Sequence, residues 1–404
     1  MACSTYNYLH LSHKIRYSLA SSPFISKPSH AFPSTFTTPF PSPSHTPIKF
    51  NVSVKFSTQS VSVSPTNTYT FTWDDVVRLS QPDSVPHDSS DLSGFFQKVK
   101  ICNRGSEKQS EFLPFVLEDQ IAGYIHNGFA NHLRRFKDVF IFPQDNSYGD
   151  RIGSHVTLHP MLRTPDDRTN AVGDVVKFLG EELIPAIPCD IILWCTNLFF
   201  TGTCSSSLLW NKGQMASLSS INMGLAVRSI FQFYAYGVHM NGYVEKDGQK
   251  LLWIGKRSQM KPTYPGMLDH LAAGGLPYGI ACGENLVKEC EEEAGIPKSI
   301  SKEAIPVGVV SYMDIDGYRY KRDVLFCYDL KLPASFRPEN QDGEVDSFKL
   351  IPVTHVANVI QRTQFFKPNC SIVIIDFLFR HGYMSPDHFG YLDLLQSLRS
   401  GDCS

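Results

Sequence analysis

One stretch of the chain, from Ala272 to Ile296, joins a small-residue strand to an acidic helix and constrains the fold more than any other. It reads AAGGLPYGIACGENLVKECEEEAGI, and Gly295 stands where a helix would end. At about 100° per residue, positions i, i+3 and i+4 share one helix face. Glu289, Glu292 and Glu293 are therefore predicted to project together from one side of this helix.

Three carboxylates on one helix face repel one another unless a cation lies among them. Mg²⁺ prefers oxygen ligands and a site completed by substrate phosphates, and Mn²⁺ accepts similar ligands. Such an ion neutralises and orients a diphosphate and lowers the pKa of water. Gly274 and Gly275 let the backbone pass close to the ion and the phosphates. We therefore predict that Glu289, Glu292 and Glu293 bind Mg²⁺ or Mn²⁺.

The segments around this motif alternate between strand and helix patterns from Tyr236 onward. Strands are predicted at 236–244, 250–258, 267–275, 307–316, 318–333 and 347–353, and helices at 283–296, 354–363 and 369–382. The turn between the first two strands contains Gly248. Mixed strands around one acidic helix predict an α/β/α sandwich with a mixed sheet, spanning residues 234–395.

The acidic segment resembles the Nudix box, G-x5-E-x7-R-E-U-x-E-E-x-G-U, in which U is apolar. The matching positions are Gly274, Glu289, Cys290, Glu292, Glu293, Gly295 and Ile296. The resemblance implies that the three helix glutamates bind metal and that one of them serves as the base, with Glu289 and Glu293 as the candidates. It also assigns Gly274, Gly275 and Lys288 to the substrate-binding part of the site.

Two positions depart from the family pattern. Ile280 stands where the family has an upstream glutamate, and Lys288 replaces arginine, which keeps the charge but loses the bidentate fork. Glu284 lies one turn before Lys288 and is expected to pair with it rather than to bind metal. Glu291 is expected to point away from the site into solvent.

Further candidates lie outside the box. Glu344, in a loop before a strand, is a candidate base or metal ligand, and a plain turn residue is the alternative. Strand-end residues Lys256 and Arg257 are candidates for phosphate contact, as are Lys367 and Asn369 before a helix, where Asn369 is equally expected as an N-cap. We expect His270 to be a hydrogen-bonded structural histidine and Trp253 a core residue, and Tyr278 could stack on a ligand ring.

The first 70 residues have a different composition from the rest. They contain no Asp or Glu, which first appears at Asp74, and are rich in Ser, Thr and Pro with five basic residues. This composition predicts a disordered chloroplast transit peptide, and an unaddressed disordered tail is the alternative. The apolar run Leu183–Phe200 contains two prolines, Asp190 and Asn197, so we do not expect a membrane span.

Residues 71–185 are predicted to form an α+β companion domain without a catalytic constellation. Helices are expected around Ile121, Ile125 and Phe129 and over 168–185, with a strand at 138–143. Segment 186–233 fits neither strand nor helix spacing, and it resembles a retained intron or a mistaken splice junction. We treat it as an atypical linker.

The overall resemblance is to the plant and fungal Nudix branch similar to thiamine diphosphate hydrolases. It implies hydrolysis of thiamine diphosphate, or a damaged form of it, to the monophosphate and phosphate. Two alternatives stay open: a hydrolase of nucleoside diphosphate derivatives and a decayed module that only binds a diphosphate. A diphosphate isomerase would need a reactive cysteine facing the metal, and Cys290 is instead expected on the packing side of the helix. A net charge of −2 argues against nucleic-acid and membrane partners, and the oligomeric state is not predicted.

Overall fold

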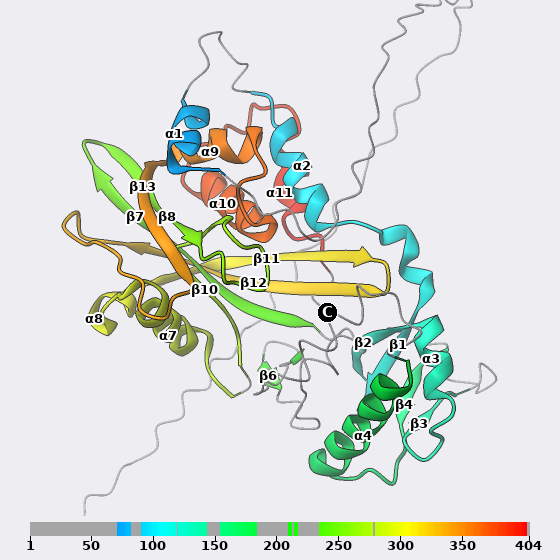
Figure 1. Ribbon diagram of the computed structural model, residues 1–404. Helices are drawn as coiled ribbons and strands as arrows, with labels where there is room; N and C mark the ends of the chain where they lie inside the picture. Colours follow the sequence, from blue (N-terminus) through cyan, green and yellow to red (C-terminus); the bar gives the residue numbers. More distant parts are fainter. Residues whose placement is uncertain are drawn as a thin grey trace, which may run out of the picture. The chain divides into compact units, whose positions relative to one another are not determined.

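The computed structural model describes residues 71–81, 90–118, 120–143, 154–183, 209–211, 214–216, 234–277 and 279–401, which belong to one compact unit (Figure 1). The predicted leader, Tyr278 and most of segment 186–233 lie outside these ranges. Within that segment, strands β5 (Leu209–Asn211) and β6 (Gln214–Ala216) pair with each other.

The first described helices pack against the C-terminal end of the chain. They are α1 (Trp73–Ser80) and α2 (Ser93–Cys102), followed by the 3₁₀ helix η1 (Ser106–Glu111). Thr72 begins α1 with a capping box that includes Asp75. Val76, Phe95 and Val99 join the same buried core as the helices near the C-terminus. Residues 71–102 thus contribute to the core of the predicted 234–395 domain.

The companion region contains a four-stranded sheet of order β2-β1-β4-β3. Its elements are β1 (Phe112–Leu117), β2 (Gln120–His126), α3 (Asn127–Leu133), β3 (Phe140–Ile141), β4 (Val156–Leu158) and α4 (Pro165–Leu183). The predicted helix through Ile121 and Ile125 is wrong, because both residues lie in β2, which pairs with β1. Their i, i+4 spacing suits a helix, but Gly123 and neighbouring β-branched residues favour a hairpin once β1 is present.

The C-terminal sheet has seven strands, with β11-β12-β7-β8-β13 as its main path, β10 beside β7 and β9 beside β8. The strands are β7 (Ala235–Lys246), β8 (Gln249–Arg257), β9 (Leu268–Asp269), β10 (Ala272–Gly275), β11 (Ile305–Asp316), β12 (Arg319–Lys331) and β13 (Val345–Pro352). Only β7 and β12 run parallel among these pairs, so the sheet is mixed. Asp247 and Gly248 both have positive φ at the β7–β8 turn, as a tight hairpin requires.

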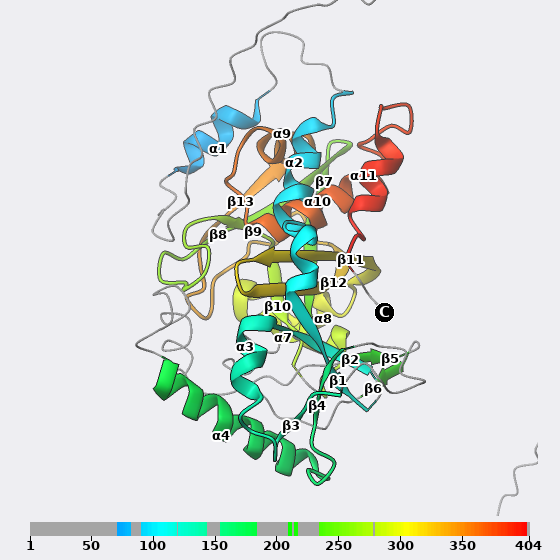
Figure 2. The ribbon, with the colours of Figure 1, turned by 90° about the vertical axis from the view of Figure 1, so that its right-hand side faces the viewer.

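Helices cover both faces of this sheet (Figure 2). They are α7 (Cys282–Ala294) and α8 (Lys298–Ser301) on one face, and α9 (Val353–Arg362), α10 (Pro368–Arg380) and α11 (Tyr391–Ser397) on the other. The core beneath α10 includes Ile372, Val373 and Phe377, and the core beneath α7 includes Val238 and Met240. Side chains alternate along β7 between these two cores, as its period of two requires. The predicted mixed α/β sandwich is confirmed.

No helix among the described residues combines the length and the apolar character that a bilayer crossing needs. The described cysteines are unpaired, and four of the five are buried, which agrees with their predicted role as small core residues.

Candidate functional site

Helix α7 is fixed on the sheet by its apolar face and by a left-handed cap. Leu286, Cys290 and Ala294 are buried at i, i+4 and i+8. Gly295 ends the helix with φ of 62°, and the N–H of Ile296 donates to the carbonyl of Cys290 at 2.9 Å. This packing leaves Glu289 and Glu293 on the flank of the helix that faces strand β10.

A buried amide also ties the helix to the strand end. The Nδ2 of Asn285 donates to the carbonyl oxygen of Gly275 at 3.1 Å, and Asn285 is fully buried. The connection from β10 to α7 is therefore closed by a side chain within the first turn of the helix. Sequence reasoning did not single out Asn285, although an amide in the first turn after a glycine loop is a plausible signal.

Gly274 makes room for the carboxylate of Glu289. A Cβ placed on Gly274 would lie 2.2 Å from Glu289 Cδ and 2.4 Å from Oε1. The Glu289 carboxyl group therefore packs directly on the strand backbone, which only a glycine permits. Gly275 differs, because a Cβ there would meet nothing within 4 Å. Burial raises the pKa of Glu289, and Lys288 partly offsets that effect.

Glu293 is held against the same strand one helical turn later. Its Oε2 accepts a hydrogen bond from the backbone N–H of Ala273 at 2.8 Å. Burial raises the pKa of Glu293 to about 8, and the nearby charge of Asp269 adds to the effect. A buried carboxyl group with this pKa can exchange a proton near neutral pH, as a general base or acid requires.

Glu292 lies further out and is bound by a lysine. Lys288 Nζ is 2.6 Å from Glu292 Oε2 and 3.5 Å from Glu289 Oε1. The predicted pairing of Lys288 with Glu284 is wrong, because Lys288 contacts the adjacent Glu289 and Glu292, which lies one turn later on the helix. Among the described residues, the ligand atoms of the three glutamates are not gathered within 4.8 Å of one another, the spacing at which such side chains could share one metal ion. A bound cation would therefore have to displace Lys288 from Glu292.

Glu344 lies near the carboxylates but is paired elsewhere. It forms an ion pair with Lys261, and its backbone carbonyl accepts from the N–H of Ser258 at 2.9 Å. Its charge contributes to the raised pKa of both Glu289 and Glu293. The structure thus brings Glu344 within electrostatic reach of the predicted site, as a half-exposed loop residue.

Behind the carboxylates lies a buried acid that sequence reasoning missed. Asp269 Oδ2 lies 2.6 Å from Arg257 Nη1 and 3.5 Å from Lys367 Nζ. Although burial opposes it, the charges of Lys367 and Arg257 lower the pKa of Asp269. Arg257 and Lys367 therefore pair with Asp269. The sequence could have indicated this pairing, because Asp269 lies inside an apolar strand and aspartates are rarely buried without a partner.

Two buried histidines adjoin Asp269. His239 of β7 and His270, which lies between β9 and β10, have ring centroids 5.0 Å apart and planes at 86°. Burial lowers the pKa of His270 to about 4 and that of His239 well below its usual value. The expectation of a hydrogen-bonded His270 is wrong in one respect, because its Nε2 is buried without a partner in the described structure.

The remaining candidates have structural surroundings. Lys256 Nζ donates to the carbonyl of Phe71 at 2.6 Å and lies over its ring, so it does not face open space. Asn369 is not the N-cap of α10, because Lys367 takes that position and Pro368 begins the helix. Trp253 is in the core, as predicted, and Cys290 packs against Met240, away from any metal position.

The two departures from the box line one recess, with Ile280 just before α7 and Lys288 on the helix. The recess measures 600 Å³, and Glu284 also lines it. Glu291 points outward and pairs with Lys298 at 3.1 Å. Because Ile280 has no carboxylate, the acidic side chains that the Nudix pattern and its neighbourhood provide near β10 are the helix glutamates and Glu344.

The residues present fit a hard divalent cation. Glu289 and Glu293 are partly buried carboxyl groups, and desolvation by burial raises the pKa of each. The cradle at Gly274 and the N–H of Ala273 fix both groups on one strand. Mg²⁺ and Mn²⁺ prefer ligands that are all oxygen atoms, and the carboxyl groups of Glu289 and Glu293 provide such ligands.

This arrangement makes the stability of the metal-free protein depend on pH. Native Glu293 keeps its proton up to about pH 8, whereas the unfolded side chain loses it near 4.5. The native state therefore binds more protons in between, and the free energy of unfolding must fall as pH rises through that window. The lowered histidine pKa values act oppositely, but only below their ordinary value of 6.5.

We therefore expect the metal-free protein to lose stability between about pH 6.5 and 8.5, as measured by urea unfolding. The Glu293→Gln variant should show a smaller slope in the same range. Saturating Mg²⁺ should flatten the wild-type curve, because the cation replaces the proton. Equal slopes for wild type and variant would contradict the burial-based assignment.

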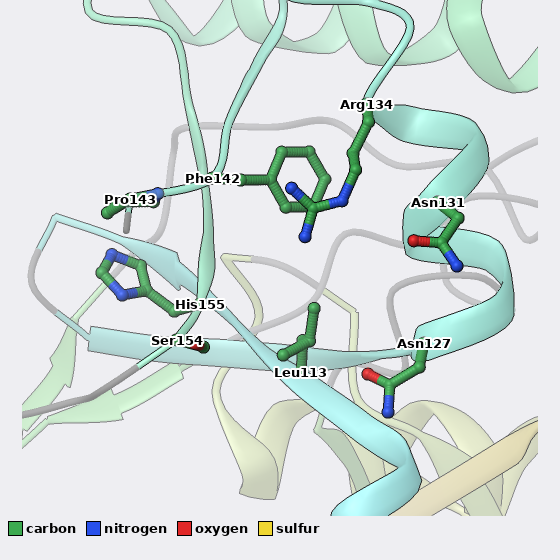
Figure 3. Close-up of a pocket in the computed structure, with 8 residues that line it drawn as sticks. All are labelled: Leu113, Asn127, Asn131, Arg134, Phe142, Pro143, Ser154 and His155. Atoms are coloured by element: carbon green, nitrogen blue, oxygen red, sulfur yellow. The ribbon is translucent and has the colours of Figure 1, made fainter. Parts of the chain in front are cut away.

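The companion region has a pocket of its own (Figure 3). Asn127 and Asn131 project from α3, and the guanidinium of Arg134 lies 4.1 Å from the centroid of the Phe142 ring. The pocket measures 510 Å³, and none of its eight lining residues is an acid. The pocket therefore offers amide and hydroxyl oxygens, but no carboxylate, to a ligand.

Comparison with protein families assigns the companion region separately. Residues 94–188 match a family described as a domain of unknown function, DUF4743. Nudix hydrolase 20, chloroplastic, of Arabidopsis thaliana is 57% identical over 335 residues, covering 83% of this chain and 84% of that protein. Nudix hydrolase 24, chloroplastic, of the same plant is 54% identical over 355 residues, covering 88% and 90%.

Solved structures of Nudix proteins match about a third of the chain. An Ap4A hydrolase of C. elegans covers 37% of this chain and 98% of its own, with 14% identity and a TM-score of 0.28. The Nudix domain of NrtR from Shewanella oneidensis, complexed with ADP ribose, covers 36% and 87%, with 16% identity and a TM-score of 0.29. With two plant relatives above 50% identity along most of its length, the chain belongs to the Nudix hydrolases, a family that generally uses a divalent metal, and it is a chloroplast hydrolase of phosphoric anhydrides.

Proposed function

We propose that the protein hydrolyses the diphosphate of thiamine diphosphate, or of a damaged form of it, to the monophosphate and phosphate. The observation that carries the hydrolytic part is the pair of partly buried carboxyl groups, Glu289 and Glu293, held against β10 by the cradle at Gly274 and by the N–H of Ala273. The choice of thiamine rests on the sequence resemblance to that branch of the family.

In this proposal Glu289, Glu292 and Glu293 hold Mg²⁺ or Mn²⁺. When bound, the cation supplies neutralisation of the diphosphate charge and activation of water. Gly275 leaves the end of the strand open for phosphate oxygens to approach, whereas the space at Gly274 is taken by the carboxylate of Glu289. Lys288, released from Glu292, is placed to meet a phosphate oxygen, as a lysine does through its point charge.

The proton that the attacking water loses needs an acceptor. Glu293 has a pKa of about 8 in the cation-free site, so a cation is needed to keep it ionised at neutral pH. Glu289 is less buried and closer to Lys288, which suits a ligand role. Glu344 stands at the rim and is the second candidate base, because releasing Lys261 would free its carboxylate.

The test is Mg²⁺-dependent phosphate release by the full chain from a panel of diphosphates. Thiamine diphosphate and its oxidised forms should be turned over fastest, with kcat/KM at least about tenfold above ADP and ADP-ribose, a difference that about 1.4 kcal/mol of selective binding gives. Faster turnover of ADP-ribose would replace the thiamine assignment with a nucleoside one. Binding without release, equal in Glu292→Gln and wild type, would support a non-catalytic module.

A further inference from the structure

A second cluster of ligating groups lies on the other face of the strand that carries Gly274. His239, His270 and Cys370 each offer one ligand atom, and these atoms all lie within 4.8 Å of one another. His239 and His270 are each 4% exposed, and Cys370 is fully buried. The cluster therefore joins three potential ligands in a space closed to bulk solvent.

Both imidazoles carry a buried nitrogen without a hydrogen-bond partner. His239 Nδ1 and His270 Nε2 have none in the described structure, and the edge-to-face contact of the two rings does not provide one. Buried polar side-chain atoms are rarely left unpaired, and two such nitrogens beside one thiol call for a common explanation. A single ion that accepts their lone pairs would satisfy both within the space available.

We propose that His239, His270 and Cys370 bind one soft metal ion with a filled d shell, Zn²⁺ or Cu⁺. Imidazole nitrogen and thiolate sulfur are the ligands that these ions select, whereas Mg²⁺ selects the carboxylate oxygens at α7. On binding, the Cys370 thiol releases its proton to solvent and the sulfur bonds the metal. No oxidation or reduction takes place.

The charged groups around Cys370 determine the charge balance that a bound metal ion would need. Cys370 Sγ lies 2.7 Å from Asp269 Oδ1, and Asp269 also pairs with Arg257 and Lys367. Asp269 accepts the hydrogen bond of the Cys370 thiol, and this bond is lost when the thiol gives up its proton to bind a metal. Asp269 is already shared between two cations, so it is not free to balance a further positive charge. The negative charge of the Cys370 thiolate is therefore needed to balance the metal ion. The nearby positive charges of Arg257 and Lys367 repel singly charged Cu⁺ less than doubly charged Zn²⁺.

The position of the cluster indicates a structural role. Its ligands come from β7, from the segment between β9 and β10, and from the first turn of α10. His239 pairs in register with Ala273, whose N–H holds Glu293. A metal here would tie α10 to the sheet directly behind the carboxylate site. This inference does not depend on which diphosphate the enzyme cleaves.

The experiment measures metal bound to the tag-free full chain after dialysis against Zn²⁺, or against Cu⁺ without oxygen. We expect about one equivalent per chain in wild type, and its loss in His270→Gln and in Cys370→Ser. Cys327→Ser is the matched control, since Cys327 is equally buried in the same core but outside the cluster, and it should retain the ion. Competition with Zn²⁺ and Cu⁺ chelators separates the two ions.

Cobalt gives a readout that the carboxylate site cannot mimic. Co²⁺ bound by Cys370 should show a thiolate-to-metal charge-transfer band, which Glu293→Gln keeps and Cys370→Ser loses. Circular dichroism establishes that each variant is folded before it is compared. A folded wild type that binds neither Zn²⁺ nor Cu⁺, or binds cobalt without this band, would overturn the proposal. So would an unchanged metal content in both ligand variants.

Discussion

Replacing Glu293 with glutamine should lower kcat by about 10³-fold while leaving the fold intact, within the usual range for loss of a general base. Glutamine is nearly isosteric, and its side-chain oxygen can still accept the hydrogen bond that Ala273 N–H now gives to the carboxylate at 2.8 Å. What disappears is the negative charge and the capacity to take a proton. Steady-state phosphate release at saturating Mg²⁺ measures the change.

The matched control is Glu291→Gln, two residues earlier on the same helix. Glu291 faces away from β10 and pairs with Lys298, so its loss should change kcat by less than about twofold, as surface ion pairs contribute little. If both variants lose activity equally, the effect reflects the charge of the helix. If Glu293→Gln stays active, Glu289 or Glu344 must provide the base.

A single added methyl group at Gly274 should reduce kcat about 10²-fold, because a Cβ there would lie 2.2 Å from Glu289 Cδ. The contact is with the flexible end of a side chain, so we expect the carboxylate to swing away and the melting temperature to change little. Gly283→Ala is the control, since a Cβ at this exposed position of α7 meets nothing within 4 Å and Gly283 has no part in the proposed site. Its activity should remain near wild type.

A double-mutant cycle identifies the cause of the Gly274 effect. In a Glu289→Ala background the clash is absent, so Gly274→Ala should add little further loss, and the two changes should be strongly non-additive. Additive losses would show that Gly274→Ala acts on the backbone or on phosphate approach instead. Kinetics of the four proteins and thermal unfolding separate these outcomes.

The helix glutamates illustrate how far local spacing reaches. A period of 3.6 residues places Glu289, Glu292 and Glu293 on one flank and Glu291 on the other, and this follows from the chain alone. The same local rule failed at Ile121 and Ile125, where spacing of four also suits a helix. A neighbouring strand, β1, was available there to pair with them, and pairing partners are not visible within a short window.

The roles of the basic residues depended on contacts distant in sequence. Lys256, Arg257 and Lys367 look like free phosphate ligands in the sequence. In the fold, Lys256 is bound by Phe71, while Arg257 and Lys367 converge on Asp269. Asp269 and Lys367 are separated by almost a hundred positions, and only the closure of α10 onto the sheet brings them together.

By itself, the sequence determined the acidic helix, its glycine-preceded strand, the mixed α/β architecture and the family, because these depend on periodicity and fixed spacing between near neighbours. Only the tertiary structure decided which carboxylates are buried, that Lys288 binds Glu292 rather than Glu284, and that His239, His270 and Cys370 meet. Burial and long-range contacts arise only when separate elements pack together. Desolvation then changes the pKa values of side chains, and this change cannot be read from the identity of the residues alone.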